Sequence, residues 1–165
     1  MTMRILLTFS ALTLLVPGTL LAGAADTAPV VRYAVEGKYE NVRDDLINAI
    51  TGRGLVIDHN SHVAKMLDRT GKDVGSTKRI YGDDQGQTFS FCSAVVSRKT
   101  MEADPHNILF CPYTIALYTT VAEPKKVYLA YRRPQRTDDS AASKAALKEV
   151  EMLLDGIARE ALNLN

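Results

Sequence analysis

The sequence has few of the features that mark specialised protein classes. Two cysteines in 165 residues are too few for a miniprotein built on disulfides. Neither charge sign dominates, since 20 basic residues stand against 19 acidic ones, so the basic footprint of a nucleic-acid-binding protein is missing. With 46% hydrophobic and 24% charged residues, the composition is that of a soluble globular protein. It excludes a disordered tail protein, a collagen-like repeat and a polytopic membrane protein.

Motifs for catalysis and for cofactors are also missing. The chain contains no G-x-G-x-x-G and no P-loop, so a nucleotide cofactor has no visible binding loop. No G-x-S-x-G elbow is present, and the absence of CxxCH excludes covalently attached c-type haem. The sequence is therefore more informative about compartment and organisation than about an activity.

The first part of the chain has the three segments of a secretory signal. Arg4 provides a positive start, an apolar stretch follows from Ile5 to Leu21, and small residues at 22–25 offer a cleavage site after Ala24 or one residue later. We therefore expect residues 1–24 to be a cleaved signal peptide and residues 25–165 to form one domain, periplasmic or secreted. Removal of Arg4 leaves 19 basic against 19 acidic residues, so we expect no nucleic-acid partner. Because cleavage also removes the apolar stretch, we expect no integral membrane segment in the remaining chain.

The remaining residues alternate between strand and helix patterns. Apolar spacing of three and four predicts helices, including a long amphipathic helix that ends the chain, and β-rich runs predict strands. The alternation favours a single-domain α+β two-layer sandwich, in which a mixed β-sheet is packed by helices. We expect strands at 29–36, 55–59, 77–81, 88–93, 108–122 and 127–132, and helices at 39–53, 61–70, 95–103 and 141–162.

Five short segments carry a resemblance to a known family. They are Ile57-Asp58-His59, Phe91-Cys92-Ser93-Ala94, Ala103-Asp104-Pro105, Phe110-Cys111-Pro112-Tyr113 and Val127–Arg132. In order and spacing they resemble the DUF302 family of small bacterial and archaeal domains, over about residues 30–162. The resemblance implies a compact α+β sandwich and a homodimer, but no reaction. More typical members have Phe-Gly-Asn-Pro at 91–94 and no cysteine at 111, so this chain is similar to an exported, two-cysteine variety.

The two cysteines, Cys92 and Cys111, have three interpretations. In an oxidising compartment a disulfide is favoured, and it would close a loop of about 18 residues worth roughly 3 kcal/mol. The alternatives are a ligand-binding or redox-active pair and two separately buried thiols. If the flanking strands are parallel neighbours the cysteines lie too far apart to bond, whereas an antiparallel or offset arrangement brings them together.

The histidines are the candidate ligands for a metal. His59 and His62 lie at i and i+3 beside Asp58, and on one helix face they would chelate a transition metal or flank a haem. The alternative is that Asp58, Asn60 or Ser61 caps the following helix. His106 becomes a further ligand only if the fold brings it close.

Tyrosines crowd the predicted strands near the centre of the chain. Core or interface packing is their default role, although Tyr113 is a candidate to line a ligand pocket. Met66 lies on the apolar side of its helix and is expected in the core rather than as a haem ligand.

Three functions compete on these residues. The first is a binding or interaction module for a small ligand, haem or metal, with Asp58, His59, His62, His106 and Tyr113 as candidate binding residues. The second is a periplasmic thiol or redox enzyme that uses Cys92 and Cys111, in sulfur chemistry. The third is a structural subunit of an envelope complex.

Overall fold

The computed structural model describes residues 28–164 as one α+β domain built on a five-stranded sheet. The strand order is β1-β5-β4-β3-β2, and every neighbouring pair is antiparallel. The strands are β1 (Val30–Glu36), β2 (Val56–His62), β3 (Tyr81–Cys92), β4 (Tyr113–Thr120) and β5 (Glu123–Arg132). The helices are α1 (Tyr39–Thr51), α2 (Val63–Thr70), α3 (Ala94–Ala103), the 3-10 helix η1 (Pro105–Phe110) and α4 (Ala141–Ala161).

Buried and more exposed residues alternate along the central strands. The buried positions are the odd-numbered ones from 113 to 119 in β4 and from 127 to 131 in β5, and most of them hold large apolar or aromatic side chains. Because successive side chains of a strand point to opposite faces, one face of the sheet becomes the core. Its fully buried side chains include Ile115, Leu117, Val127 and Leu129.

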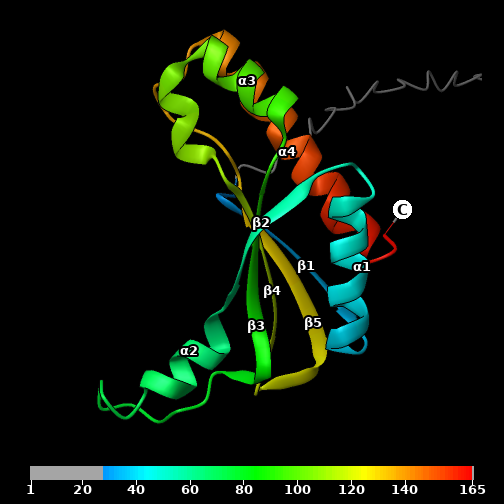
Figure 1. Ribbon diagram of the computed structural model, residues 1–165, viewed down its shortest axis with the longest axis vertical. Coiled ribbons are helices and arrows are strands. Elements are labelled where there is room, and N and C mark those ends of the chain that lie inside the picture. The colour runs from blue at the N-terminus through cyan, green and yellow to red at the C-terminus, as the bar shows by residue number, and fades with distance from the viewer. Residues whose placement is uncertain (1–27, 165) are drawn as a thin grey trace, which may run out of the picture.

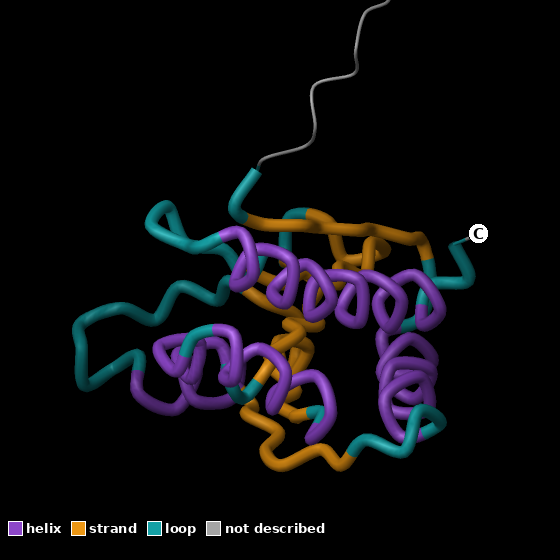
Figure 2. Tube along the Cα trace, turned by 90° about the horizontal axis from the view of Figure 1, so that it is seen from above, coloured by secondary structure: helices purple, strands orange, loops and turns teal. Residues whose placement is uncertain are grey.

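Helices α1 and α4 cover this core face and pack against each other (Figures 1 and 2). The buried stripe of α4 runs through Leu147, Val150, Leu154 and Ile157, with the spacing of three and four that places residues on one side of a helix. Ser140 caps the helix, accepting a hydrogen bond from the backbone N–H of Ser143 at 3.1 Å. The long closing helix is where the periodicity predicted it.

Within residues 28–164, no layer covers the other face of the sheet, which is bordered at its two ends. In Figure 1, α2 lies at the lower end on the side opposite α1, and α3 with η1 lies at the upper end. Gly86 allows the lower contact, since a Cβ atom there would come within 3.1 Å of the Ala64 Cβ on α2. We call this surface the open face.

Strand β3 differs from its sequence prediction. Residues 82–86 have turn chemistry and were expected to separate two strands, but 81–92 form one strand with a register shift against β4 between Tyr81 and Gly86. Asp84 lies in this irregular segment with a positive φ of 51°. The glycines and acids therefore form a bulge rather than a hairpin turn.

The predicted single-domain α+β sandwich is confirmed, but the sheet is antiparallel throughout instead of mixed. The expected strand at 108–122 is also divided, since its first residues belong to η1 and β4 begins at Tyr113. Within the described residues, no helix combines the length and apolarity needed to cross a bilayer. The predicted signal peptide lies outside those residues.

Candidate ligand-binding site

Cys92 and Cys111 form a disulfide bond, with their Cα atoms 6.4 Å apart. The antiparallel pairing of β3 and β4 explains how they meet, because Phe91 is the register partner of Tyr113 and the cysteines follow and precede these two residues. The bond therefore joins the end of β3 to the segment that leads from η1 into β4. The disulfide interpretation of the two cysteines is confirmed.

A hollow with a volume of about 540 Å³ lies at the upper end of the sheet. It reaches the open face through Thr88, Ala116 and Ala130, and the core side through Tyr113, Tyr131 and residues of α4. This volume is within the range of about 300–1,000 Å³ that is usual for small-molecule sites. Its lining is largely apolar, and comprises Val30, Thr88, Leu109, Phe110, Pro112, Tyr113, Thr114, Ala116, Ala130, Tyr131, Arg132, Pro134, Val150 and Leu154.

Small side chains explain why the sheet is hollowed at this place. Thr88, Ala116 and Ala130 are register partners across three adjacent strands, so they form a row on the open face. The next row towards the lower end contains Tyr118 and Tyr128, whose rings stack with centroids 5.1 Å apart. A row of short side chains beside a row of aromatic rings leaves a depression, and its floor is the short row.

The upper wall of the hollow is formed by η1 and the residues after it. Leu109 is 62% exposed although it is a large apolar side chain, and Phe110 and Pro112 follow it along the wall. The disulfide at Cys111 anchors this wall to β3. Exposed apolar side chains beside an apolar hollow are typical of a binding surface.

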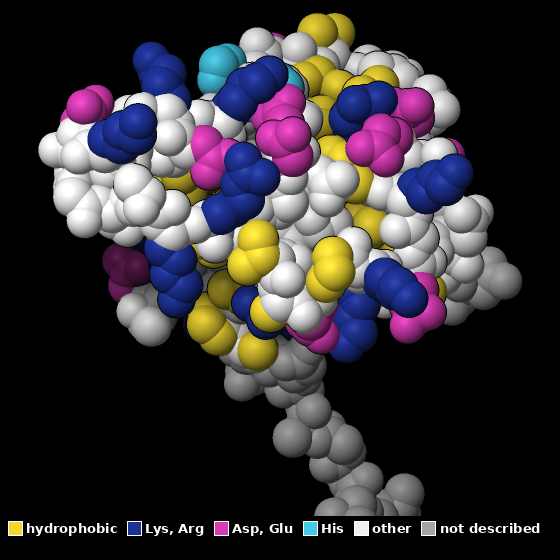
Figure 3. Space-filling model, turned by 90° about the horizontal axis from the view of Figure 1, so that it is seen from below, with side chains coloured by type: hydrophobic (Ala, Val, Ile, Leu, Met, Phe, Trp, Pro, Cys, Tyr) yellow, Lys and Arg dark blue, Asp and Glu magenta, His cyan; other side chains and the backbone are white. Residues whose placement is uncertain are grey.

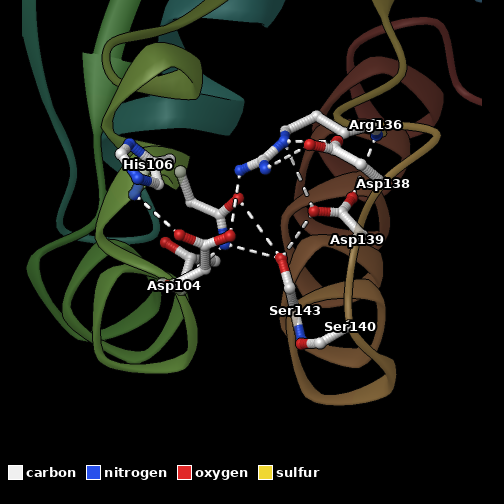
Figure 4. Close-up of polar contacts among 9 residues, drawn as sticks. Asp104, His106, Arg136, Asp138, Asp139, Ser140 and Ser143 are labelled. Atoms are coloured by element: carbon white, nitrogen blue, oxygen red, sulfur yellow. Dashed lines mark hydrogen bonds and ion pairs between the residues drawn. The ribbon is translucent and has the colours of Figure 1, made fainter.

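A buried polar network fixes the same wall to α4 (Figure 4). Asn107 of η1 is 1% exposed; its amide donates to the Ser143 hydroxyl at 2.9 Å and to the Thr100 carbonyl at 3.0 Å. Ser143 in turn donates to the buried Asp139 at 2.9 Å. Asn107 is therefore a structural residue that holds η1 in position.

Arg136 extends this network towards the surface. Its guanidinium lies 3.0 Å from a carboxylate oxygen of Asp104 and 3.0 Å from one of Asp138. The hydrogen bond from the His106 backbone N–H, together with Arg136, lowers the pKa of Asp104, and the Arg136 hydrogen bond lowers the pKa of Asp138. The predicted ligand His106 thus lies in η1, is exposed, and contacts Asp104 through its backbone N–H.

His59 and His62 are not brought together. Both lie in β2, where His59 is the partner of Ser90 and His62 the partner of Gln87, so they point to opposite faces. Asp58 sits at the register shift between Ile57 and His59. The alternative interpretation, a helix cap from 58–61, is wrong, because these residues are in the strand and α2 begins after His62 without a side-chain cap.

His62 instead pairs with Asp84 of the β3 bulge. The His62 Nδ1 lies 2.9 Å from an Asp84 oxygen, and the Lys65 ammonium lies 3.2 Å from the other. Burial would raise the pKa of Asp84, but the hydrogen bonds from His62 and Lys65 outweigh it and lower that pKa. In the described part of the chain, no group of three or more His, Cys, Asp or Glu side chains is arranged to hold a metal ion.

Tyr113 is a residue that the sequence singled out and that does line the hollow. It is 3% exposed, its ring meets Phe91 edge to face, and its hydroxyl lies 2.9 Å from that of Ser97. Burial raises the pKa of the Tyr113 hydroxyl, against a smaller opposite effect of the Ser97 hydrogen bond. Tyr113 therefore forms part of the packed wall rather than a reactive group.

A family model for the domain of unknown function DUF302 matches residues 31–161. The chain belongs to the DUF302 family. The resemblance read from the sequence is confirmed, and the two-cysteine feature is present in this DUF302 protein as a disulfide.

The fold of this DUF302 protein is similar to the crystal structure of an uncharacterized conserved DUF302 protein from Bacillus stearothermophilus. The two share 12% sequence identity with a TM-score of 0.66, and the match covers 81% of this chain and 98% of the other. At that identity the likeness shows the fold alone. A comparison with curated proteins finds no significant match.

Sequence reasoning missed most residues of the hollow in this DUF302 chain. Apart from Tyr113, none of its lining residues was proposed as a binding residue. A signal was nevertheless present, because the small Ala116 and Ala130 each stand between large buried residues in β4 and β5. Successive side chains point to opposite faces, so short residues at these positions predict that the outer face is recessed there.

Proposed function

We propose that this protein is an exported binding module that holds a small, largely apolar ligand in the hollow of its open face. The observation that carries the proposal is the hollow itself, with a volume of about 540 Å³, a floor of Thr88, Ala116 and Ala130, and an apolar wall from η1. A concave apolar site with a few polar groups is the usual form of a small-molecule site.

The way the wall is held supports binding rather than a mobile surface loop. The Cys92–Cys111 disulfide fixes one end of η1 to the sheet, and Asn107 fixes its middle to α4. A site that is already formed does not have to be ordered when the ligand arrives, so less binding free energy is lost.

The disulfide also supports the export that the N-terminal sequence predicts. Disulfides persist in the periplasm and outside the cell, and they are rare in the cytosol. The charges on the molecular surface are consistent with a small-molecule partner: on the face shown in Figure 3, Lys and Arg side chains are interspersed with Asp and Glu, and hydrophobic side chains lie between them.

Metal or haem binding in the hollow has less support. Among the lining residues, Tyr113 and Tyr131 are the side chains of a type that ligates iron in proteins, and their hydroxyls are engaged with Ser97 and Asp155. His59 lies on the open face, but on the edge strand β2 and outside the lining. The ligand that fits the lining is organic and is held by apolar contact.

The test is a fluorescence titration with the neutral apolar probe N-phenylnaphthylamine. Wild-type protein is expected to bind it saturably at one site. Ala116→Phe places a ring on the floor of the hollow without entering the core, because Ala116 points away from α1 and α4, and it should weaken binding at least tenfold. Ala34→Phe is the matched control, since Ala34 is an exposed alanine of the same face outside the lining.

Two results would overturn the proposal: a wild-type protein without saturable binding, or equal weakening by both phenylalanine variants. A second copy of the chain is the competing occupant of the open face. If it covers the hollow, size-exclusion chromatography would show a dimer that dissociates in Ala116→Phe, and the probe would not bind to the wild-type dimer.

A further inference from the structure

Two arginines stand beside the hollow on neighbouring strands. Arg132 of β5 is part of its lining, and Arg32 lies on β1. Val30 is the register partner of Arg132, and Ala130 is the register partner of Arg32, so the two arginines are diagonal neighbours on the open face. Diagonal neighbours lie about 7–8 Å apart, which is close enough for two long side chains to reach one group.

Neither arginine has an ion-pair partner within residues 28–164. Other arginines in this part of the chain do pair: Arg43 with Asp44, Arg53 with Glu160, and Arg136 with Asp104. The side chains of Arg32 and Arg132 are both exposed, and no residue from 28 to 164 forms a hydrogen bond or salt bridge with either guanidinium. Their ten guanidinium N–H donors, five on each arginine, are therefore directed to solvent or to a ligand.

Among the residues that the structure describes, the two rows of the open face that hold these arginines contain no acid. The row of Arg132 continues with Thr114, Ser90 and His59, and the row of Arg32 with Ala130, Ala116, Thr88 and Ser61. Val30 belongs to the row of Arg132, so each row has five positions. The ten positions together contain two arginines, one histidine and no acid. Two like charges held side by side repel each other, and an anion between them removes that repulsion.

We propose that the ligand of the hollow is an amphipathic organic anion, whose apolar body lies on the Ala116–Ala130 floor and whose carboxylate, or a head group of the same charge, is bound by Arg132 and Arg32. This inference rests on the proposed function and specifies its ligand class. A guanidinium matches a carboxylate with two parallel hydrogen bonds, and such charge-assisted bonds are about twice as strong as neutral ones. The rim position keeps the charged end near water while the apolar part is buried.

Decanoate and decanol test this assignment because they share one chain and differ in the head group. Each is titrated against protein that carries N-phenylnaphthylamine, and displacement of the probe is measured. Decanoate is expected to bind wild-type protein at least tenfold more tightly than decanol. Arg132→Gln and Arg32→Gln should each reduce this ratio severalfold, and the double variant should bring it close to one, with the affinity for decanol unchanged.

Arg43→Gln is the matched control, since it removes one positive charge from α1 on the covered side of the sheet and should preserve the ratio. The assignment is refuted if decanol displaces the probe as well as decanoate does, if neither displaces it, or if the decanoate preference survives in the double arginine variant. These outcomes leave binding of the probe itself intact. Failure of the proposed function is separate, because then the neutral probe does not bind at all.

Discussion

Reduction of the Cys92–Cys111 disulfide should lower the stability of the fold by an amount set mainly by the loop it closes. The cysteines are 19 residues apart in sequence. In the loop-entropy description a cross-link over that separation removes about 3 kcal/mol of conformational freedom from the unfolded chain. Small domains are stable by about 5–15 kcal/mol, so the bond accounts for a large part of the total.

Urea unfolding followed by circular dichroism measures this difference. The oxidised protein is compared with the same protein in reductant, and the slope of about 1–3 kcal/mol per molar urea converts 3 kcal/mol into a midpoint lower by about 1–3 M. The double variant Cys92→Ala, Cys111→Ala should unfold near the midpoint of the reduced wild-type protein. Reductant should not change the midpoint of that variant.

The same experiment tests the structural role of the bond in the site. Because Cys111 precedes Pro112 in the wall of the hollow, the reduced protein should bind N-phenylnaphthylamine more weakly than the oxidised protein under conditions in which both are folded. A stability loss below about 1 kcal/mol on reduction would contradict the loop argument. Unchanged probe affinity would show that the bond does not hold the wall.

Three further perturbations follow from buried or charged groups. Asn107→Ala should lower the free energy of unfolding, measured in urea, by about 1–3 kcal/mol, because it leaves buried polar partners unpaired. The control Asn41→Ala, at an exposed position, should lower it by less than about 0.5 kcal/mol. Tyr39→Phe should leave stability unchanged or raise it by about 1 kcal/mol, since the buried Tyr39 hydroxyl has no hydrogen-bond partner in the described structure. Burial also raises the pKa of Tyr39, so above about pH 10 this hydroxyl ionises more readily in the unfolded chain and the stability of the fold declines. This alkaline decline in thermal unfolding should be smaller in Tyr39→Phe. The lowered pKa of Asp104 has the opposite sign: its contribution is present above about pH 4 and lost as pH falls further, so Arg136→Gln should flatten the acid decline, and an unchanged acid profile would contradict the pairing.

The layer arrangement could be predicted because it depends on periodicity. Leu147, Val150, Leu154 and Ile157 repeat at helical spacing, and the structure buries all four in α4. The alternation of buried and more exposed residues in β4 and β5 is equally local. Such patterns require no knowledge of which strands are neighbours.

Sheet order was not available from the sequence, and several errors follow from that. The segment 82–86 has the residues of a turn, but pairing with β4 carries the strand through it as a bulge. The partner of His62 is Asp84 in that bulge, 22 residues away, so neither spacing nor residue type indicated the pair. The cysteine pairing was undecided for the same reason, and the antiparallel register of β3 and β4 resolves it.

The hollow was missed because the residues of its floor carry no metal-ligating, nucleophilic thiol or titratable group. Sequence reasoning looked for histidines, cysteines and tyrosines, whereas the floor consists of Thr88, Ala116 and Ala130. What makes these residues a site is that β3, β4 and β5 align them in one row and that η1 stands beside them. Both facts belong to the tertiary structure.

The most direct measurement of the central claim is the map of backbone amide chemical shifts by NMR during titration with decanoate. If the hollow is the binding site, the saturable shifts gather at Thr88, Ala116 and Ala130 and at the η1 wall, and those of α1 stay in place. Saturable shifts confined to α1 and the covered side of the sheet, or no saturable shift at all, would contradict the assignment of the open face as the binding surface.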